Sequence, residues 1–180
     1  MRVIAGAAKG CRLNAPKGMH TRPTADRVKE GLFSAIQFEI EGTRVLDLFA
    51  GSGQLAIEAL SRGAKEAVLV DEDAEAVRVI RENLAKTGFS GKARVLRADY
   101  RQFLQNSGER FDLIFLDPPY AETYLENALN LISEIDILNE NGIIICEKAK
   151  DGTLSASFPG LKQDRTYRYG KTEVLLYRKE

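Results

Sequence analysis

The fold class of this protein follows from the segment TRVLDLFAGSGQLAIEAL, Thr43 to Leu60. An apolar run at Arg44–Leu48 predicts a strand, a loop with Gly51 and Gly53 follows, and a helix is expected after it. Backbone amides at such a strand-to-helix loop often hold a nucleotide or a related ligand. We therefore expect a ligand site here. The alternative is that the glycines only allow a tight turn.

The same order of strand and helix repeats along the chain. Amphipathic segments such as 73–88, which Gly88 is expected to end, separate further apolar runs. The segment DRTYRYGKTEVLLYRK breaks the pattern, with a turn signal at Gly170 between two β-prone runs. We predict an α/β fold with a mostly parallel sheet, helices on both faces and a C-terminal antiparallel hairpin. The further predicted strands lie at 67–70, 94–98, 111–117 and 142–148.

Acidic residues stand at the ends of four predicted strands: Asp47, Asp71, Asp99 and Asp117. Open α/β sheets bind ligands at this edge. A nicotinamide dinucleotide and S-adenosylmethionine both fit the glycine loop, but the dinucleotide carries two phosphate charges that a row of carboxylates would repel. S-adenosylmethionine carries a sulfonium and an ammonium against one carboxylate. The acidic edge therefore favours S-adenosylmethionine.

Each acid at this edge has an expected contact with that cofactor. Asp71 would accept both ribose hydroxyls, Asp99 would accept the adenine amino group, and Asp47 would lie near the methionine ammonium or order the loop. For any one of them, a helix cap or a turn is the alternative role. The rest of the predicted cofactor-binding set is Phe49, Gly51, Gly53, Glu72 and Tyr100.

The stretch FDLIFLDPPY, Phe111 to Tyr120, ends an apolar strand with an acid, two prolines and an aromatic ring. The prolines force the chain to leave the strand stiffly and in a fixed direction. Such a turn can hold a planar amine for methyl transfer, with Asp117 and the Pro118 carbonyl accepting its hydrogens and Tyr120 stacking on the base. The alternative is a proline-terminated strand followed by a core tyrosine. The predicted catalytic residues are Asp117, Pro118, Pro119 and Tyr120.

Charge is unevenly distributed, although Lys+Arg and Asp+Glu both total 26. Up to Lys29 there are seven bases and one acid, Asp26, so this segment carries +6 and the remainder −6. A basic amino-terminal segment favours a polyanionic partner, and a solvated charged segment is the alternative. We divide the chain into a basic arm or small hairpin at 1–22 and a methyltransferase domain at 23–180.

Three motifs together resemble the RsmD family of bacterial methyltransferases, which modify guanine N2 in small-subunit ribosomal RNA. They are DLFAGSG, DPPY and the more specific GAAKGCRLNAPKG…TRPTADRVKEGLF. The resemblance implies a seven-stranded Rossmann-like sheet, S-adenosylmethionine as donor and a ribosomal RNA guanine, within a ribosomal particle, as acceptor. It also implies that the residues assigned above form the donor and acceptor sites. One departure is Asp71, where a longer glutamate is expected, so the ribose contact would shift to Glu72 or pass through water.

With an RNA acceptor, the basic segment would contact phosphates and supply affinity without reading sequence. The predicted RNA-binding residues are Lys9, Arg12, Arg22 and Arg27. Two other function classes stay open. One is a DNA or protein amino-methyltransferase that uses the same turn, and the other is a noncatalytic cofactor-binding or RNA-binding module.

The sequence also argues against some classes of protein. No His/Cys cluster suggests a metal site, and Cys11 and Cys146 give no disulfide framework. The start of the chain is too short and interrupted for a signal peptide, and no apolar run approaches the ~20 residues of a membrane span. We expect a cytoplasmic protein with no metal and no membrane partner.

Overall fold

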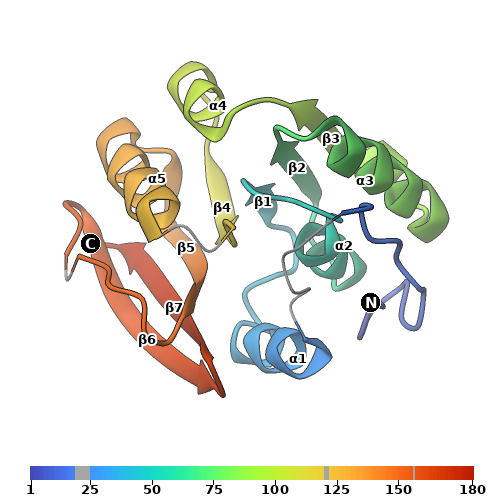
Figure 1. Ribbon diagram of the computed structural model, residues 1–180, viewed down its shortest axis with the longest axis horizontal. Helices are drawn as coiled ribbons and strands as arrows, with labels where there is room; N and C mark the ends of the chain where they lie inside the picture. The colour runs from blue at the N-terminus through green and yellow to red at the C-terminus, as the bar shows by residue number, and fades with distance from the viewer. Residues whose placement is uncertain (19–24, 120–121, 156) are drawn as a thin grey trace.

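The computed structural model describes residues 1–18, 25–119, 122–155 and 157–180. Strands and helices alternate through most of this chain (Figure 1). The helices are α1 (Asp26–Ala35), α2 (Gln54–Ser61), α3 (Ala74–Thr87), the short 3₁₀ helix η1 (Ser90–Lys92), α4 (Tyr100–Asn106) and α5 (Glu122–Ile135). The strands are β1 (Arg44–Asp47), β2 (Glu66–Asp71), β3 (Ala93–Arg97), β4 (Phe111–Leu116), β5 (Leu138–Ala149), β6 (Leu161–Tyr169) and β7 (Thr172–Lys179).

The strands form a seven-stranded sheet in the order β3-β2-β1-β4-β5-β7-β6. The first five in this order pair in parallel, and β7 pairs antiparallel with both β5 and β6. Gly170, with φ 60°, lies in the turn that joins β6 to β7. These features confirm the predicted α/β class and the C-terminal hairpin. β5 begins at Leu138, four residues before the predicted start, because Leu138 already pairs with Phe111.

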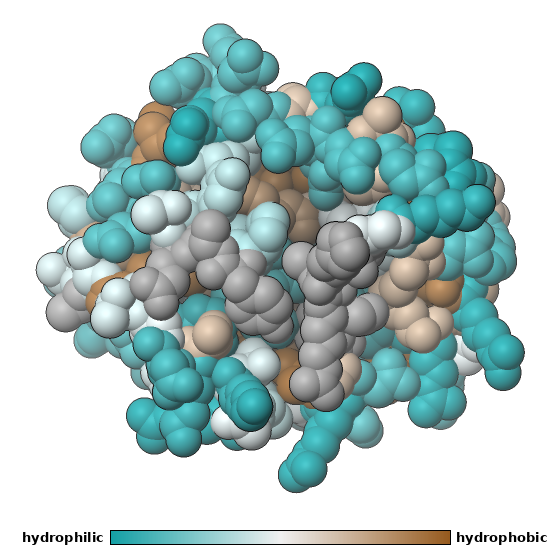
Figure 2. All heavy atoms as spheres, in the orientation of Figure 1, coloured by the Kyte–Doolittle hydropathy of each residue, from teal (hydrophilic) through white to brown (hydrophobic). Residues whose placement is uncertain are grey.

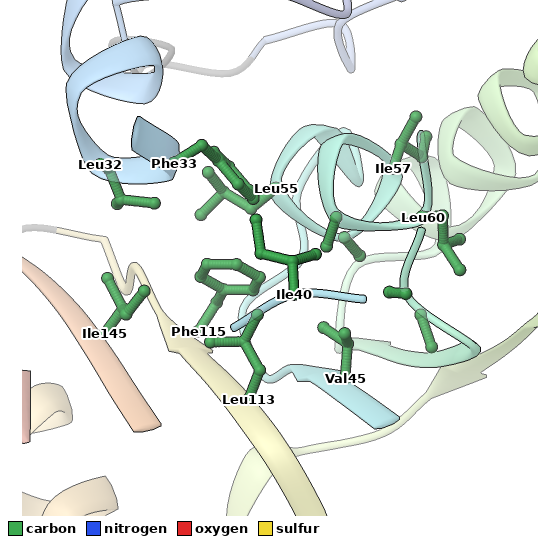
Figure 3. Close-up of a cluster of buried hydrophobic side chains, with 14 of the residues drawn as sticks. Leu32, Phe33, Ile40, Val45, Leu55, Ile57, Leu60, Leu113, Phe115 and Ile145 are labelled. Carbon is green, nitrogen blue, oxygen red and sulfur yellow. The ribbon is translucent and has the colours of Figure 1, made fainter. Parts of the chain in front are cut away.

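Helices cover both faces of the parallel part of the sheet (Figure 1). On one face Phe33 of α1 packs on Phe115 of β4, with ring centroids 5.6 Å apart, inside the cluster shown in Figure 3. On the other face α4 and α5 pack on alternate residues of the same strands, such as Leu46 and Ile114. Burial on both sides explains why these strands are continuous apolar runs.

The first 13 residues form a small hairpin that is part of the same core. Val3 donates its amide to the Cys11 carbonyl (2.9 Å), and the side chains of Val3 and Leu13 are buried in the cluster that contains α1 and α2. Gly6 lies so close to α2 that a Cβ there would come within 1.8 Å of the Ser61 carbonyl oxygen. Residues 1–13 therefore form a hairpin that packs into the same core as α1 and α2.

A candidate active site at the carboxyl edge of the sheet

The four acids singled out in the sequence follow four neighbouring parallel strands. Asp47 and Asp71 are the last residues of β1 and β2, Asp117 directly follows β4, and Asp99 lies two residues after β3. Because these strands are adjacent in the order β3-β2-β1-β4, the acids stand in a row along one edge. In Figure 2, hydrophobic side chains are visible at the bottom of a hollow near the centre of the face shown.

Asp71 holds the glycine loop in place. Its Oδ2 accepts the Gly51 amide (2.8 Å) and its Oδ1 accepts the Asp73 amide (2.9 Å), while burial raises the pKa of the carboxyl above its ordinary value. Gly53 adopts φ 79°, and a Cβ there would lie 3.1 Å from Leu69 Cδ2. Asp71 Oδ2 thus orders the glycine loop, and Oδ1 orders the segment between β2 and α3. Glu72, one residue on, is exposed.

Asp47 is buried directly beneath the start of α2. Its Oδ2 accepts the Ala56 amide (3.3 Å), whereas its Oδ1 has no hydrogen-bond partner in the part of the chain that the structure describes. Only 1% of the residue is exposed, and this burial raises its pKa to about 7. A buried acceptor without a partner is costly unless a ligand or water satisfies it. Asp47 is therefore suited to a cationic or hydrogen-donating group next to the loop.

Asp99 caps α4 and leads into an aromatic cluster. Its Oδ1 accepts the amides of Arg101 (2.9 Å) and Gln102 (3.3 Å), which is the capping role considered above. The next residue, Tyr100, is buried against Phe49 at 5.1 Å and Tyr124 at 5.9 Å between ring centroids. The sequence-based set missed Tyr124. Its position in the first turn of α5, the helix that follows DPPY, could have indicated that it lies near the site.

A pocket lies at the ends of β4 and β5, where the DPPY turn begins. Its volume is roughly 490 Å³, counted with the solvent at its mouth. Tyr120 lies outside the described residues, but the rest of the turn lines this pocket. The segment after β5 folds back to form the opposite wall, which sequence reasoning did not foresee. The lining residues are Asp117, Pro118, Pro119, Leu125, Glu147, Lys148, Ala149, Gly152, Thr153 and Leu154.

The predicted RNA-binding residues fall on the hairpin and on α1. Lys9, Arg12 and Arg27 are exposed, and Arg22 lies outside the described residues. Lys29, counted in the basic charge of this segment, is instead fully buried and paired with Glu58. The exposed positive charge of this segment is therefore smaller than the +6 counted from the sequence.

Within the described residues, no group of three His, Cys, Asp or Glu side chains is placed to hold a metal ion. No helix among the same residues is long and apolar enough to cross a membrane. Cys146 is completely buried in the sheet, and burial raises the pKa of its thiol.

Comparison with known proteins agrees with this fold. The chain is 43% identical to the "Putative rRNA methyltransferase YlbH" of Bacillus subtilis, over 99% of each chain. It is 34% identical to the "Ribosomal RNA small subunit methyltransferase D" of Escherichia coli, over all of this chain and 90% of that protein. The solved structure of the "Putative methyltransferase yhhF" from Escherichia coli superposes with a TM-score of 0.87 at 34% identity, covering 100% of this chain and 98% of that one.

The family described as "Conserved hypothetical protein 95" matches residues 1–178, nearly the whole chain. The fold is that of the S-adenosylmethionine-dependent methyltransferases, with the seven-stranded sheet found above. The chain belongs to this family, the RsmD family of methyltransferases.

Proposed function

We propose that this protein transfers a methyl group from S-adenosylmethionine to the exocyclic N2 amine of a guanine in small-subunit ribosomal RNA. The observation that carries the proposal is the position of Asp117, Pro118 and Pro119. They line a pocket at the end of β4, the strand next to β1, which leads into the glycine loop. A donor at the loop and an acceptor in the pocket would meet at this edge.

The residues present fit the proposed cofactor. Asp47 offers a buried oxygen without a described partner, suited to the methionine ammonium. Glu72, an exposed carboxylate directly after Asp71, is proposed to bind the ribose hydroxyls, while the two Asp71 oxygens hold the Gly51 and Asp73 amides. Asp99 keeps its Oδ2 for the adenine edge. When bound, S-adenosylmethionine supplies an electrophilic methyl group on its sulfonium sulfur.

The acceptor amine needs help from the protein, because its lone pair is delocalised into the base. Asp117 and the Pro118 carbonyl accept the two amine hydrogens, which localises the lone pair and stabilises the positive charge that develops on nitrogen. Tyr120 stacks on the base, as proposed from the sequence. The prolines fix the direction of these acceptors, so the amine is held in line with the bond that breaks.

RNA is favoured as the acceptor by two observations. Arg12 and Arg27 are exposed on the side of the molecule that carries the hairpin and α1, where they can contact phosphates. Two relatives that cover nearly the whole chain are named as rRNA methyltransferases. The target guanine would have to leave its stack to enter the pocket. A ribosomal particle as substrate and a cytoplasmic location are part of the same proposal.

Methyl transfer from labelled S-adenosylmethionine tests this function. The acceptors are small-subunit particles from cells that lack the protein, the naked RNA from them, DNA and protein. We expect label on one guanine of the ribosomal RNA, identified as N2-methylguanine by mass spectrometry. Label on DNA or protein alone would establish the alternative amino-methyltransferase. Cofactor or RNA binding without any transfer would establish a noncatalytic module.

A further inference from the structure

A second pocket adjoins the proposed acceptor pocket and lies over the C-terminal hairpin. Its volume is roughly 720 Å³, counted with the solvent at its mouth. We call it the hairpin groove. The two pockets share one wall, formed by Lys148, Gly152, Thr153 and Leu154. The remaining lining residues of the groove are Ser155, Gln163, Thr166, Arg168, Glu173, Leu175 and Tyr177.

The groove follows one face of the sheet. Arg168 of β6 and Lys148 of β5 both stand opposite Glu173 of β7, and Thr166 stands opposite Leu175. Directly opposed residues of antiparallel strands point to the same side. β5, β7 and β6 lie side by side in that order (Figure 1), and the shared lining residues of the two pockets connect the acceptor pocket to the groove over β7 and β6.

An ion cluster fixes the shared wall. Glu173 accepts from Lys148 Nζ and from Arg168 Nε, each at 2.9 Å. Lys148 Nζ also donates to the carbonyls of Ala149 (3.2 Å) and Gly152 (2.9 Å), so it holds the turn after β5. Arg168 differs, because its side chain is 72% exposed and its two Nη groups have no partner among the described residues. Among the residues that line the groove, Lys148 and Arg168 carry two positive charges and Glu173 carries one negative charge. The net positive charge lies at Arg168, the more exposed of the two cations.

The floor of the groove is apolar and its sides can form hydrogen bonds. Leu175 and Tyr177 form the floor, and the Tyr177 hydroxyl is buried without a hydrogen-bond partner among the described residues. Gln163 and Thr166 are exposed along β6, where Gln163 Nε2 donates to Thr166 Oγ1 (2.8 Å), and the Gln163 Oε1 acceptor and the Thr166 hydroxyl hydrogen face the groove side of the strand. Amide and hydroxyl groups can bond the base of a nucleotide, and one exposed guanidinium can bond its phosphate.

We propose that the hairpin groove binds the nucleotide covalently adjacent to the target guanine, with its phosphate on Arg168 and its base beside Gln163 and Thr166. The inference rests on the proposed function and adds a specificity element to it. An RNA chain whose guanine occupies the acceptor pocket must continue past a wall of that pocket. On the far side of the wall formed by Lys148 and residues 152–154 lies the hairpin groove, whose exposed cation is Arg168.

Matched arginine variants on the two faces of β6 test the groove. Arg168→Gln removes the guanidinium in the groove, whereas Arg165→Gln changes a side chain that is 57% exposed on the opposite face. Transfer to small-subunit particles from cells lacking the protein gives kcat and KM for each variant. We expect Arg168→Gln to raise KM for the particle about tenfold, as the loss of a charged phosphate contact would. Arg165→Gln should stay within about twofold, and neither should change affinity for S-adenosylhomocysteine.

Photocrosslinking then identifies the occupant of the groove. Benzoylphenylalanine at position 166 should attach to the nucleotide next to the methylated guanine, and the same group at position 165 should not. A crosslink to a distant nucleotide or to a ribosomal protein overturns the inference, as does an equal effect of the two arginine variants. In those cases the wild-type protein still methylates RNA, so the proposed function stands and only the groove assignment fails. If the wild-type protein transfers nothing to RNA, the proposed function itself fails, and the groove assignment fails with it.

Discussion

The Nζ atom of Lys29 lies 3.7 Å from Oε2 of Glu58, and neither side chain is exposed to solvent. The same carboxylate accepts the amides of Ile4 (2.8 Å) and Ala5 (3.0 Å), and Lys29 also donates to the Arg2 carbonyl. One buried pair therefore joins the amino-terminal hairpin to α1 and α2. These buried contacts make the hairpin part of the core. Deleting it would therefore damage the fold.

Glu58→Gln should destabilise the protein strongly. The change leaves the Lys29 charge without its partner and weakens the acceptor for two backbone amides, and breaking a buried pair in this way typically costs about 3–5 kcal/mol. Glu39→Gln is the matched control, because Glu39 pairs with Arg178 at the surface and such pairs contribute about 0–1 kcal/mol. Urea unfolding measures both free energies. Equal losses would contradict the central role of the buried pair.

Substitutions of Asp71 and Glu72 should lower cofactor affinity in different ways. Asp71→Ala removes the acceptor for the Gly51 amide and loosens the loop, so it should weaken S-adenosylhomocysteine and its 2′-deoxy analogue alike, by about 1–3 kcal/mol. Glu72→Ala should weaken only the ligand that carries both ribose hydroxyls. Calorimetry with the two ligands separates these effects. If Glu72→Ala affects both ligands equally, its carboxylate does not contact the 2′-hydroxyl.

Stability should depend on pH through Asp47. Burial raises its pKa to about 7, so between about pH 4 and pH 7 the folded state binds more protons than the unfolded state. The free energy of unfolding of the cofactor-free protein should therefore fall as pH rises through this window, by up to roughly 4 kcal/mol. Asp47→Asn should remove the larger part of this dependence and leave the contribution of Asp71, whose pKa burial also raises. Urea titrations at several pH values provide the measurement, and parallel pH profiles for the two proteins would show that Asp47 is ionised throughout.

Substitution of Asp117 should lower the turnover rate much more than the stability of the protein. Asp117→Ala should lower kcat by about 10²–10³, the usual loss when an acceptor that stabilises transition-state charge is removed. Asp117→Asn keeps an oxygen but not the charge, so it should be the milder change. Single-turnover transfer gives the rate, and S-adenosylhomocysteine binding and thermal unfolding serve as controls. A folded Asp117→Ala protein with wild-type turnover would contradict the proposed mechanism.

The exposed bases of the hairpin should set the salt dependence of RNA binding. Reversing Arg12 to glutamate should weaken binding to small-subunit RNA and reduce the slope of log K against log salt by about 0.7–0.9 for a lost phosphate contact. Lys65→Glu, just before the amino end of β2 and so away from the carboxyl edge of the sheet, should leave the slope unchanged. Filter binding at several salt concentrations tests the pair. Equal slopes for Arg12→Glu and wild type would show that Arg12 is a solvated surface charge that contacts no phosphate.

Much of the fold could be read from the sequence because its signals are local. Short apolar runs, the glycine loop after Asp47 and the turn at Gly170 each depend on a few neighbouring residues, and the structure confirms the strands and the hairpin that they predict. The row of acids follows from the same logic, since residues at the ends of adjacent parallel strands must share an edge.

Only the tertiary structure decided which partner each polar group takes. Asp71 accepts the Gly51 amide from 20 residues away, and Lys29 is buried beside Glu58, whose carboxylate in turn binds amides more than 50 positions earlier. The sequence showed neither the backbone partners of Asp71 nor the burial of Lys29, which it counted only in the charge of the basic segment, because hydrogen bonding and burial depend on packing between distant segments. The hairpin groove has the same origin, since it exists only where the chain after β5 folds over β6 and β7.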